Sequence, residues 1–284
     1  MSTAAYPKEK KFVQKELIRR KDGIAVYRVK DAEGQSRVLK TFENETSLRE
    51  IRHYQLLKIY GVETIGWELD GENQLLLEDL RCSEFWRLGE ACDLDSETIA
   101  EKLALWYKDL HNQGEKMIKE LRQTWYSELD YFNLSSLKAI AERTQSQELP
   151  FWKKMREDFE ALESKVEKLN KTITYNDFYF TNLAVARDFS KALMFDYNLM
   201  GRGFRMMDIR NVCSSLSQKA GAAFCEAYAY ENPAEVLVDE LIGPLINMAM
   251  AVSRPSLPQW FNEEWQKLES GYLVQVLARI LEGE

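Results

Sequence analysis

Two aspartates and one asparagine lie at short intervals past the middle of the chain, each beside a short apolar run. Asp177 follows the alternating segment 172–174, Asn182 lies five residues further on, and Asp196 comes fourteen residues after that. Short apolar runs separated by polar residues are typical of a loop that leads into a tight hairpin. We therefore expect a loop–hairpin platform that brings these three side chains together.

These residue types suit the chemistry of phosphoryl transfer. A carboxylate at Asp177 could accept or orient the proton of an attacking hydroxyl group. The amide oxygen of Asn182 and the carboxylate of Asp196 are hard oxygen ligands of the kind that Mg²⁺ prefers. Phosphoryl transfer depends mainly on positioning and on neutralising phosphate charge, which this set could supply. The alternative is that Asp177 and Asn182 only close a turn, because a D-x-x-x-x-N pattern alone is weak evidence.

The first eighty residues have the pattern of an antiparallel sheet with one helix. Turn signals at Asp22-Gly23 and Glu33-Gly34 separate short runs rich in β-branched and aromatic residues. A helical pattern follows and stops at Gly61. The expected strands are 12–18, 24–29, 36–42, 65–69 and 74–78, and the expected helix is 46–60.

The rest of the chain is mostly helical in pattern. We expect a helix over 96–112, capped by Ser96 or Asp95 and ended by Gly114. Further helices are expected at 121–143 (one or two), over 152–169 as one amphipathic helix, and beyond 208, with strands only between 173 and 195. The predicted class is α+β, with a small β-rich lobe over 1–80, a larger helical lobe over 81–284, and a ligand cleft between them.

A lysine in the first lobe is a candidate for binding phosphate. Lys40 ends a strand-like run, and a lysine that projects from a sheet can hold phosphate oxygens as a point charge. It needs an acidic partner to fix its position, for which Glu50 on the next helix is the first choice and Glu45 the second. A single lysine viewed alone is more often a solvated surface residue.

The end of the last strand in this lobe is a candidate for binding a nucleotide base. The apolar run 75–77 changes abruptly to Glu78, Asp79 and Leu80 at the expected junction of the lobes. Extended backbone at these three residues could donate and accept hydrogen bonds with an adenine edge. An ordinary strand end is the alternative.

Composition excludes several classes of function. The net charge of −8 disfavours nucleic acid and anionic membranes as partners; it suits a cationic small substrate, or simply solubility. Four cysteines without a C-x-x-C pair and only two histidines make a zinc site unexpected. No apolar run is long enough to span a bilayer, and the first residues lack a secretory pattern, so a cytoplasmic protein is expected.

Taken together, these segments resemble the protein-kinase-like fold, and most closely its aminoglycoside phosphotransferase branch, which includes choline and ethanolamine kinases. The resemblance rests on Lys40, Glu50, the L-L-L-E-D-L junction, the Y-N-D-x-x-x-x-N loop and Phe195-Asp196. It implies a bilobal enzyme that moves the γ-phosphate of ATP or GTP to a hydroxyl group of a small, cationic, aminoglycoside-like molecule. Choline, ethanolamine or sugar kinases of the same fold are the alternatives.

The resemblance also implies a role for each candidate residue. Asp177 would be the catalytic base, while Asn182 and Asp196 would ligate Mg²⁺. Lys40, held by Glu50, would contact the α- and β-phosphates, and the backbone of residues 78–80 would bind the base. Asp208 would brace the catalytic loop.

Some features depart from the family pattern. Tyr175 and Asn176 stand where the family usually has His and Gly, and no G-x-G-x-x-G run is present. A nucleotide-binding pseudoenzyme is a competing function, although Lys40, Asp177, Asn182 and Asp196 are all intact. A protein kinase is the least favoured function, because only eleven residues separate Asp196 from Asp208.

Overall fold

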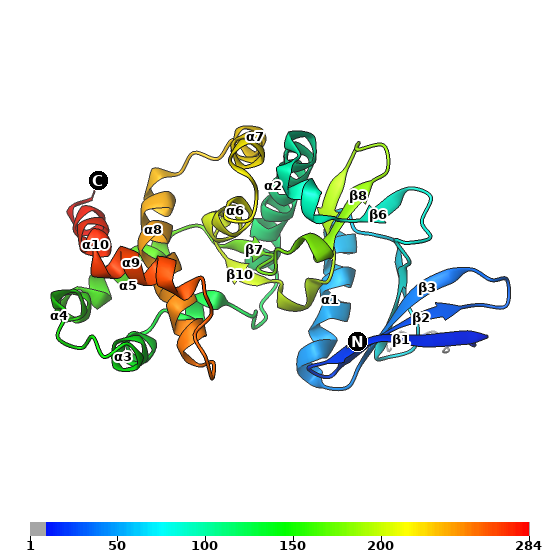
Figure 1. Ribbon diagram of the computed structural model, residues 1–284, viewed down its shortest axis with the longest axis horizontal. Helices are drawn as coiled ribbons and strands as arrows, with labels where there is room; N and C mark the ends of the chain where they lie inside the picture. The colour runs from blue at the N-terminus through cyan, green and yellow to red at the C-terminus, as the bar shows by residue number, and fades with distance from the viewer. Residues whose placement is uncertain (1–9, 284) are drawn as a thin grey trace. The chain divides into compact units, whose positions relative to one another are not determined.

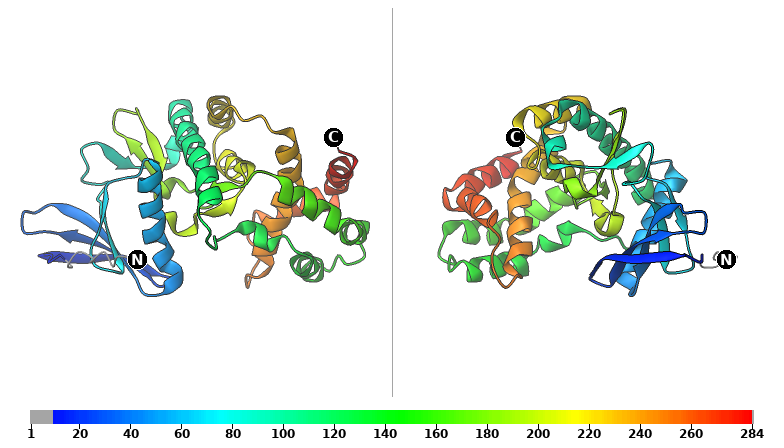
Figure 2. Two further views of the ribbon diagram at one scale, coloured as in Figure 1. Left: turned by 180° about the vertical axis from the view of Figure 1, so that it is seen from behind. Right: turned by 45° about the vertical axis from the view of Figure 1, so that its right-hand side comes forward.

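A computed structural model of the protein describes residues 10–283, which form two compact units (Figures 1 and 2). Unit 1 comprises residues 10–117, 175–200 and 211–229, and unit 2 comprises 118–174, 201–210 and 230–283. The division falls inside two helices, α2 (Glu97–Glu120) and α6 (Arg205–Cys213). The division at residue 80 between a nucleotide-binding and an acceptor-binding lobe concerns function, and it stays a prediction.

The main sheet of unit 1 is antiparallel, with the strand order β1-β2-β3-β5-β4 (Figure 1). Its core contains Val29, Leu39 and Leu76. Helix α1 follows β3; the Asn44 side chain accepts a hydrogen bond from the N–H of Ser47 at its start, and Gly61 ends it with a left-handed backbone. The expected five strands and one helix are confirmed. Their bounds are β1 Gln14–Lys21, β2 Ile24–Lys30, β3 Ser36–Phe42, α1 Glu45–Tyr60, β4 Trp67–Leu69 and β5 Gln74–Glu78.

A second, three-stranded sheet in unit 1 carries the loop–hairpin that the sequence predicted. Strands β8 (Leu183–Ala186) and β9 (Ala192–Met194) form the hairpin, and β6 (Trp86–Leu88) pairs with β8. Strand β6 was not predicted, because three residues are too few for a periodic pattern. Gly89 follows this strand, and a β-carbon there would lie 2.4 Å from the carbonyl oxygen of Phe180, so the backbones approach at a distance that only glycine allows.

Helix α2 (Glu97–Glu120) is longer than predicted. The Oγ atom of Ser96 accepts a hydrogen bond from the N–H of Ile99, as expected for a cap, but Gly114 does not end the helix. Gly114 and Met117 are both buried. Burial of this face outweighs the roughly 1 kcal/mol that glycine costs inside a helix. Helix α7 (Gln218–Tyr228) completes unit 1.

Unit 2 is mainly helical, and its core surrounds α8 (Pro233–Val252), which contacts α3, α9 and α10 (Figure 2). The buried stripe predicted for residues 152–169 is present, but two helices separated at Asp158 carry it in place of one. Residues 121–143 contain one α-helix. The remaining bounds are α3 Leu134–Arg143, α4 Pro150–Glu157, α5 Phe159–Lys168, β7 Thr172–Thr174, β10 Gly201–Gly203, α6 Arg205–Cys213, α9 Phe261–Glu269 and α10 Tyr272–Glu282.

Strands β7 and β10 pair antiparallel within unit 2. A buried ion pair joins α6 to α8 in this unit: Nε of Arg210 lies 2.8 Å from Oδ2 of Asp239. A β-carbon at Gly243 would approach this guanidinium to 2.7 Å, so glycine makes room for the pair. No helix within residues 10–283 combines the length and apolar composition needed to cross a bilayer.

Candidate active site

Lys40 lies on β3 and is held by two carboxylates. Its Nζ atom is 2.7 Å from both carboxylate oxygens of Glu50 and 2.9 Å from Oδ1 of Asp196. Only 4% of Lys40 and none of Glu50 is exposed. The predicted pairing of Lys40 with Glu50, rather than with Glu45, is confirmed, and the structure also brings Asp196 to the same ammonium group.

The electrostatics of this cluster keep the lysine charged. Burial acts to lower the pKa of Lys40, but the charges of Asp196 and Glu50 outweigh it and raise the pKa above its ordinary value. Burial raises the pKa of Glu50 to about 7, against the opposing effect of the Lys40 charge. A positively charged group is therefore fixed beside Asp196, where it can receive a phosphate oxygen.

Asp196 lies two residues after the end of β9 and has a left-handed backbone, with φ of 67°. A non-glycine residue in that region costs roughly 1–2 kcal/mol, so the surrounding contacts must hold it. The hydroxyl of Tyr175 donates to the carbonyl oxygen of Phe195, and the hydroxyl of Tyr197 donates to that of Met194 at 2.6 Å. Buried tyrosines on both sides thus fix the turn that presents Asp196.

A buried histidine supports the same turn from α1. Nδ1 of His53 lies 2.7 Å from the carbonyl oxygen of Tyr197. Burial lowers the pKa of His53 to about 4, so the ring is neutral at physiological pH and donates through Nδ1–H. This contact could not be found from a local pattern, because His53 and Tyr197 are far apart in the chain.

The loop that carries Asp177 is also held in an unusual conformation. Asn176 has φ of 66°, and its Nδ2 donates to the carbonyl oxygen of Leu199 at 2.9 Å. Nδ2 of Asn182 donates to Oδ2 of Asp177 at 3.0 Å. Burial, followed by the nearby charge of Asp196, raises the pKa of Asp177, as suits a group that takes up a proton.

The donor atoms in this loop fit a magnesium ion. Because Asn182 donates through nitrogen to Asp177, its amide oxygen is directed elsewhere. Asp196 uses Oδ1 for Lys40, and its Oδ2 accepts no hydrogen bond from residues 10–283. No group of three or more His, Cys, Asp or Glu residues in this range is placed to hold a metal by itself. Magnesium commonly takes only one or two protein oxygens and completes its shell with phosphates and water.

The predicted base-binding segment lies at the end of β5. The carboxylate of Asp79 is occupied, since it accepts from Arg28 Nε at 2.8 Å and from Ser36 Oγ at 2.7 Å. The N–H of Glu78 donates to the carbonyl oxygen of Gly66 at 2.8 Å. The N–H of Leu80 donates to no atom of residues 10–283, and Leu80 is buried, with 4% exposed.

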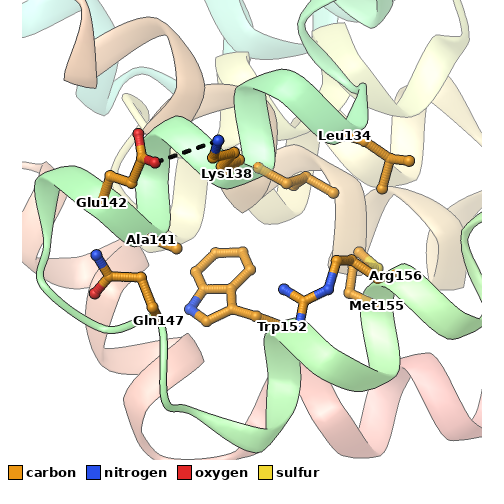
Figure 3. Close-up of a pocket in the computed structure, with 9 residues that line it drawn as sticks. Leu134, Lys138, Ala141, Glu142, Gln147, Trp152, Met155 and Arg156 are labelled. Atoms are coloured by element: carbon orange, nitrogen blue, oxygen red, sulfur yellow. Dashed lines mark ion pairs between the residues drawn. The ribbon is translucent and has the colours of Figure 1, made fainter.

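A pocket within unit 2 contains none of the predicted site residues. It has a volume of about 430 Å³ and lies between α3 and α4 (Figure 3). Trp152, Met155 and Ala141 form an apolar floor, and the Lys138–Glu142 pair lies at the rim. Since the titratable residues suited to phosphoryl transfer gather in unit 1, we place the candidate active site there.

Several solved structures with a similar fold are kinases or phosphotransferases that act on small molecules. The choline kinase of Streptococcus pneumoniae matches with a TM-score of 0.57 at 13% identity, covering 94% of each chain. A choline/ethanolamine kinase family protein from Mesorhizobium loti matches with a TM-score of 0.60 at 11% identity, over 96% of this chain and 94% of that one. An ADP-bound aminoglycoside phosphotransferase matches with a TM-score of 0.57 at 14% identity, over 95% of each. These similarities confirm the predicted kinase-like α+β fold.

Sequence comparison identifies the family. No curated protein sequence matches the chain. The model of the phosphotransferase enzyme family matches residues 19–236, which is well over half of the 284 residues and includes every candidate site residue. The predicted class of enzyme, a phosphotransferase, is thereby confirmed, and the chain belongs to the phosphotransferase enzyme family.

Proposed function

We propose that the protein transfers the γ-phosphate of ATP or GTP to a hydroxyl group of a small cationic molecule. One observation carries the proposal: the ammonium group of Lys40 binds both Glu50 and Asp196, and Asp196 lies 156 positions further along the chain than Lys40. A buried lysine shared by two carboxylates has little structural purpose that an apolar residue would not serve better. It has a clear use as a fixed positive charge for phosphate oxygens.

The candidate residues of unit 1 would bind the nucleotide and the metal ion. Lys40, kept in place by Glu50, would bind α- and β-phosphate oxygens, and the N–H of Leu80 would bind the base. Asn182 and Asp196 would hold Mg²⁺, which supplies neutralising charge to the phosphates when bound.

Asp177 would orient the acceptor hydroxyl and take its proton. Its raised pKa makes it a better proton acceptor than an ordinary exposed aspartate, while Asn182 keeps its carboxylate aimed. Oδ2 of Asp177 is the atom that accepts from Asn182, so the other carboxylate oxygen would face the substrate.

A cationic acceptor is supported by charge and by the relatives. The net charge of −8 attracts cations. Similar folds occur in a choline kinase, an ethanolamine kinase and an aminoglycoside phosphotransferase, and all of these names denote amine-bearing substrates. We therefore rank aminoglycosides, choline and ethanolamine above neutral sugars as acceptors, and we propose that the enzyme works in the cytoplasm.

A panel assay of nucleotide consumption tests the function. The protein is incubated with ATP or GTP, with and without Mg²⁺, against aminoglycosides, choline, ethanolamine and sugars, and ADP or GDP is measured. We expect Mg²⁺-dependent turnover with at least one amine-bearing acceptor. Turnover only with neutral sugars would refute the cationic acceptor, and nucleotide binding without any turnover would favour a pseudoenzyme.

Two substitutions make the test specific. Asp177→Asn keeps the shape of the side chain and removes the base, so kcat should fall by about 10²–10⁴-fold while nucleotide affinity stays unchanged. Asp188→Asn is the matched control, because Asp188 is an exposed aspartate in the β8–β9 turn that accepts from Ser190 at 2.6 Å. Equal activity of the two variants would refute the role of Asp177.

A further inference from the structure

Two cysteines face each other across adjacent helices of unit 1. Cys213 ends α6 and Cys225 lies on α7, and their Sγ atoms are 3.5 Å apart. Both are free thiols. A disulfide bond has a sulfur–sulfur distance of about 2.05 Å, so each sulfur would have to move by only about 0.7 Å.

The surrounding backbone keeps the two thiols close together. Gly221 lies one helical turn before Cys225 and therefore on the same face of α7. A β-carbon at Gly221 would lie 4.0 Å from the carbonyl oxygen of Cys213, so this face of α7 approaches the end of α6 closely. The connection between the helices is short, and Ser217 anchors it by capping α7 and by donating its N–H to the carbonyl oxygen of Leu94 at 3.0 Å.

The two thiols differ in environment. Cys225 is exposed, whereas Cys213 is partly buried. Burial, followed by the proximity of Cys225, raises the pKa of Cys213 to about 12. Because Cys225 is exposed, an oxidant in solution reaches it first, while the raised pKa keeps Cys213 a protonated thiol that does not react with the oxidant. The Cys213 sulfur lies 3.5 Å from the sulfur that is oxidised.

We infer that Cys213 and Cys225 form a site of reversible oxidation by hydroperoxides, which closes an intramolecular disulfide between α6 and α7. The thiolate of Cys225 attacks one oxygen of hydrogen peroxide and the O–O bond breaks. Cys225 becomes a sulfenic acid, and hydroxide departs. The sulfur of Cys213 then attacks the sulfenic sulfur, losing its proton as the S–O bond breaks, and water departs. In sum, two thiols and one hydrogen peroxide give one disulfide and two waters, and a dithiol reductant reverses the change.

Peptide mapping of the full chain tests this inference. The reduced protein is treated with hydrogen peroxide, remaining thiols are blocked with N-ethylmaleimide, and the product is digested with trypsin. Lys219 lies between the two cysteines, so a disulfide joins two separate tryptic peptides. We expect this linked pair, a fall in blocked cysteines from four to two, and full recovery with dithiothreitol.

Substitutions at the other cysteines provide the control. Cys82 and Cys92 are exposed thiols elsewhere in unit 1, and the Cys82→Ser/Cys92→Ser double variant should form the link as readily as the parent. Cys225→Ser should lose it, and Cys213→Ser provides the same test if Cys225→Ser folds poorly. The inference is overturned if Cys225 reaches sulfinic acid without a link, or if disulfides form only between molecules through Cys82 or Cys92.

Discussion

Replacing Lys40 by methionine tests whether the carboxylates of the candidate site depend on the buried ammonium group. Methionine keeps most of the apolar stem of the side chain and removes three contacts of 2.7, 2.7 and 2.9 Å. Glu50 is wholly buried, so the substitution leaves a carboxylate without its charge partner. Breaking a buried pair in this way costs about 3–5 kcal/mol of unfolding free energy.

The dependence on pH sharpens this prediction. In the native protein burial already raises the pKa of Glu50 to about 7, above the ordinary value of 4.5, and removing Lys40 must raise it further. A carboxyl group with a raised folded pKa contributes stability that is fully present below its unfolded pKa and is lost as pH rises through the folded pKa. In the parent, ionisation of Glu50 stops lowering the free energy of unfolding near pH 7. In Lys40→Met it continues to lower this free energy by about 1.4 kcal/mol per pH unit. The cost of the substitution should therefore be about 1 kcal/mol larger at pH 8 than at pH 6.

Urea unfolding followed by tryptophan fluorescence at pH 6, 7 and 8 measures both effects. Lys191→Met is the matched control, because Lys191 forms an exposed pair with Glu63 at 2.6 Å. An exposed pair is worth about 0–1 kcal/mol. If the two lysine variants lose the same stability, or if the cost of Lys40→Met is the same at all three pH values, the argument from burial is wrong.

Three further substitutions and conditions test other parts of unit 1. His53→Asn keeps a hydrogen-bond donor near the position of Nδ1 but cannot titrate. Because the folded pKa of His53, about 4, lies below the ordinary 6.5, the parent should lose up to about 3 kcal/mol of unfolding free energy as pH falls from 6.5 through 4. The variant should lack this part of the pH dependence in urea titrations. Gly89→Ala would place a β-carbon 2.4 Å from the carbonyl oxygen of Phe180, so we expect a loss of about 1–3 kcal/mol in the same assay, whereas Gly221→Ala, with nothing nearer than 4.0 Å, should not destabilise. Calorimetry with ATP or GTP should show weaker binding in EDTA, and Asn182→Ala should reduce that difference; equal affinity with and without Mg²⁺ would contradict the proposed metal ligands.

The sequence predicted the elements whose patterns are long enough to be periodic. The first lobe was predictable because turn residues and β-branched runs alternate there, and Glu50 could be chosen as an acidic residue on the helix that follows the strand of Lys40. The three-residue strand β6 carries no such pattern. The bend at Asp158 was missed for a different reason: the buried stripe of α4 and α5 continues across it, so periodicity alone cannot separate one helix from two.

Within the candidate site, the polar side chains could be predicted from the sequence, but the contacts that hold them in place could not. The sequence indicated Asp177, Asn182 and Asp196 from the chemistry of their side chains, and their catalytic roles stay predictions. The contact of Lys40 with Asp196 joins residues too distant for any local pattern to reveal. The same is true of His53, whose partner is a backbone carbonyl group.

Two residues with a left-handed backbone lie at the turns that position Asp177 and Asp196 in unit 1. Within residues 10–283, six non-glycine residues have positive φ, and two of them are Asn176, directly before Asp177, and Asp196 itself. Such a backbone persists only where other contacts over-determine it. Those contacts come from Tyr175, Tyr197 and the Asn176 side chain, which bind carbonyl oxygens of the segment 194–199. The same aromatic residues thus stabilise both loops, so the positions of Asp177 and Asp196 depend on one buried cluster rather than on two independent turns.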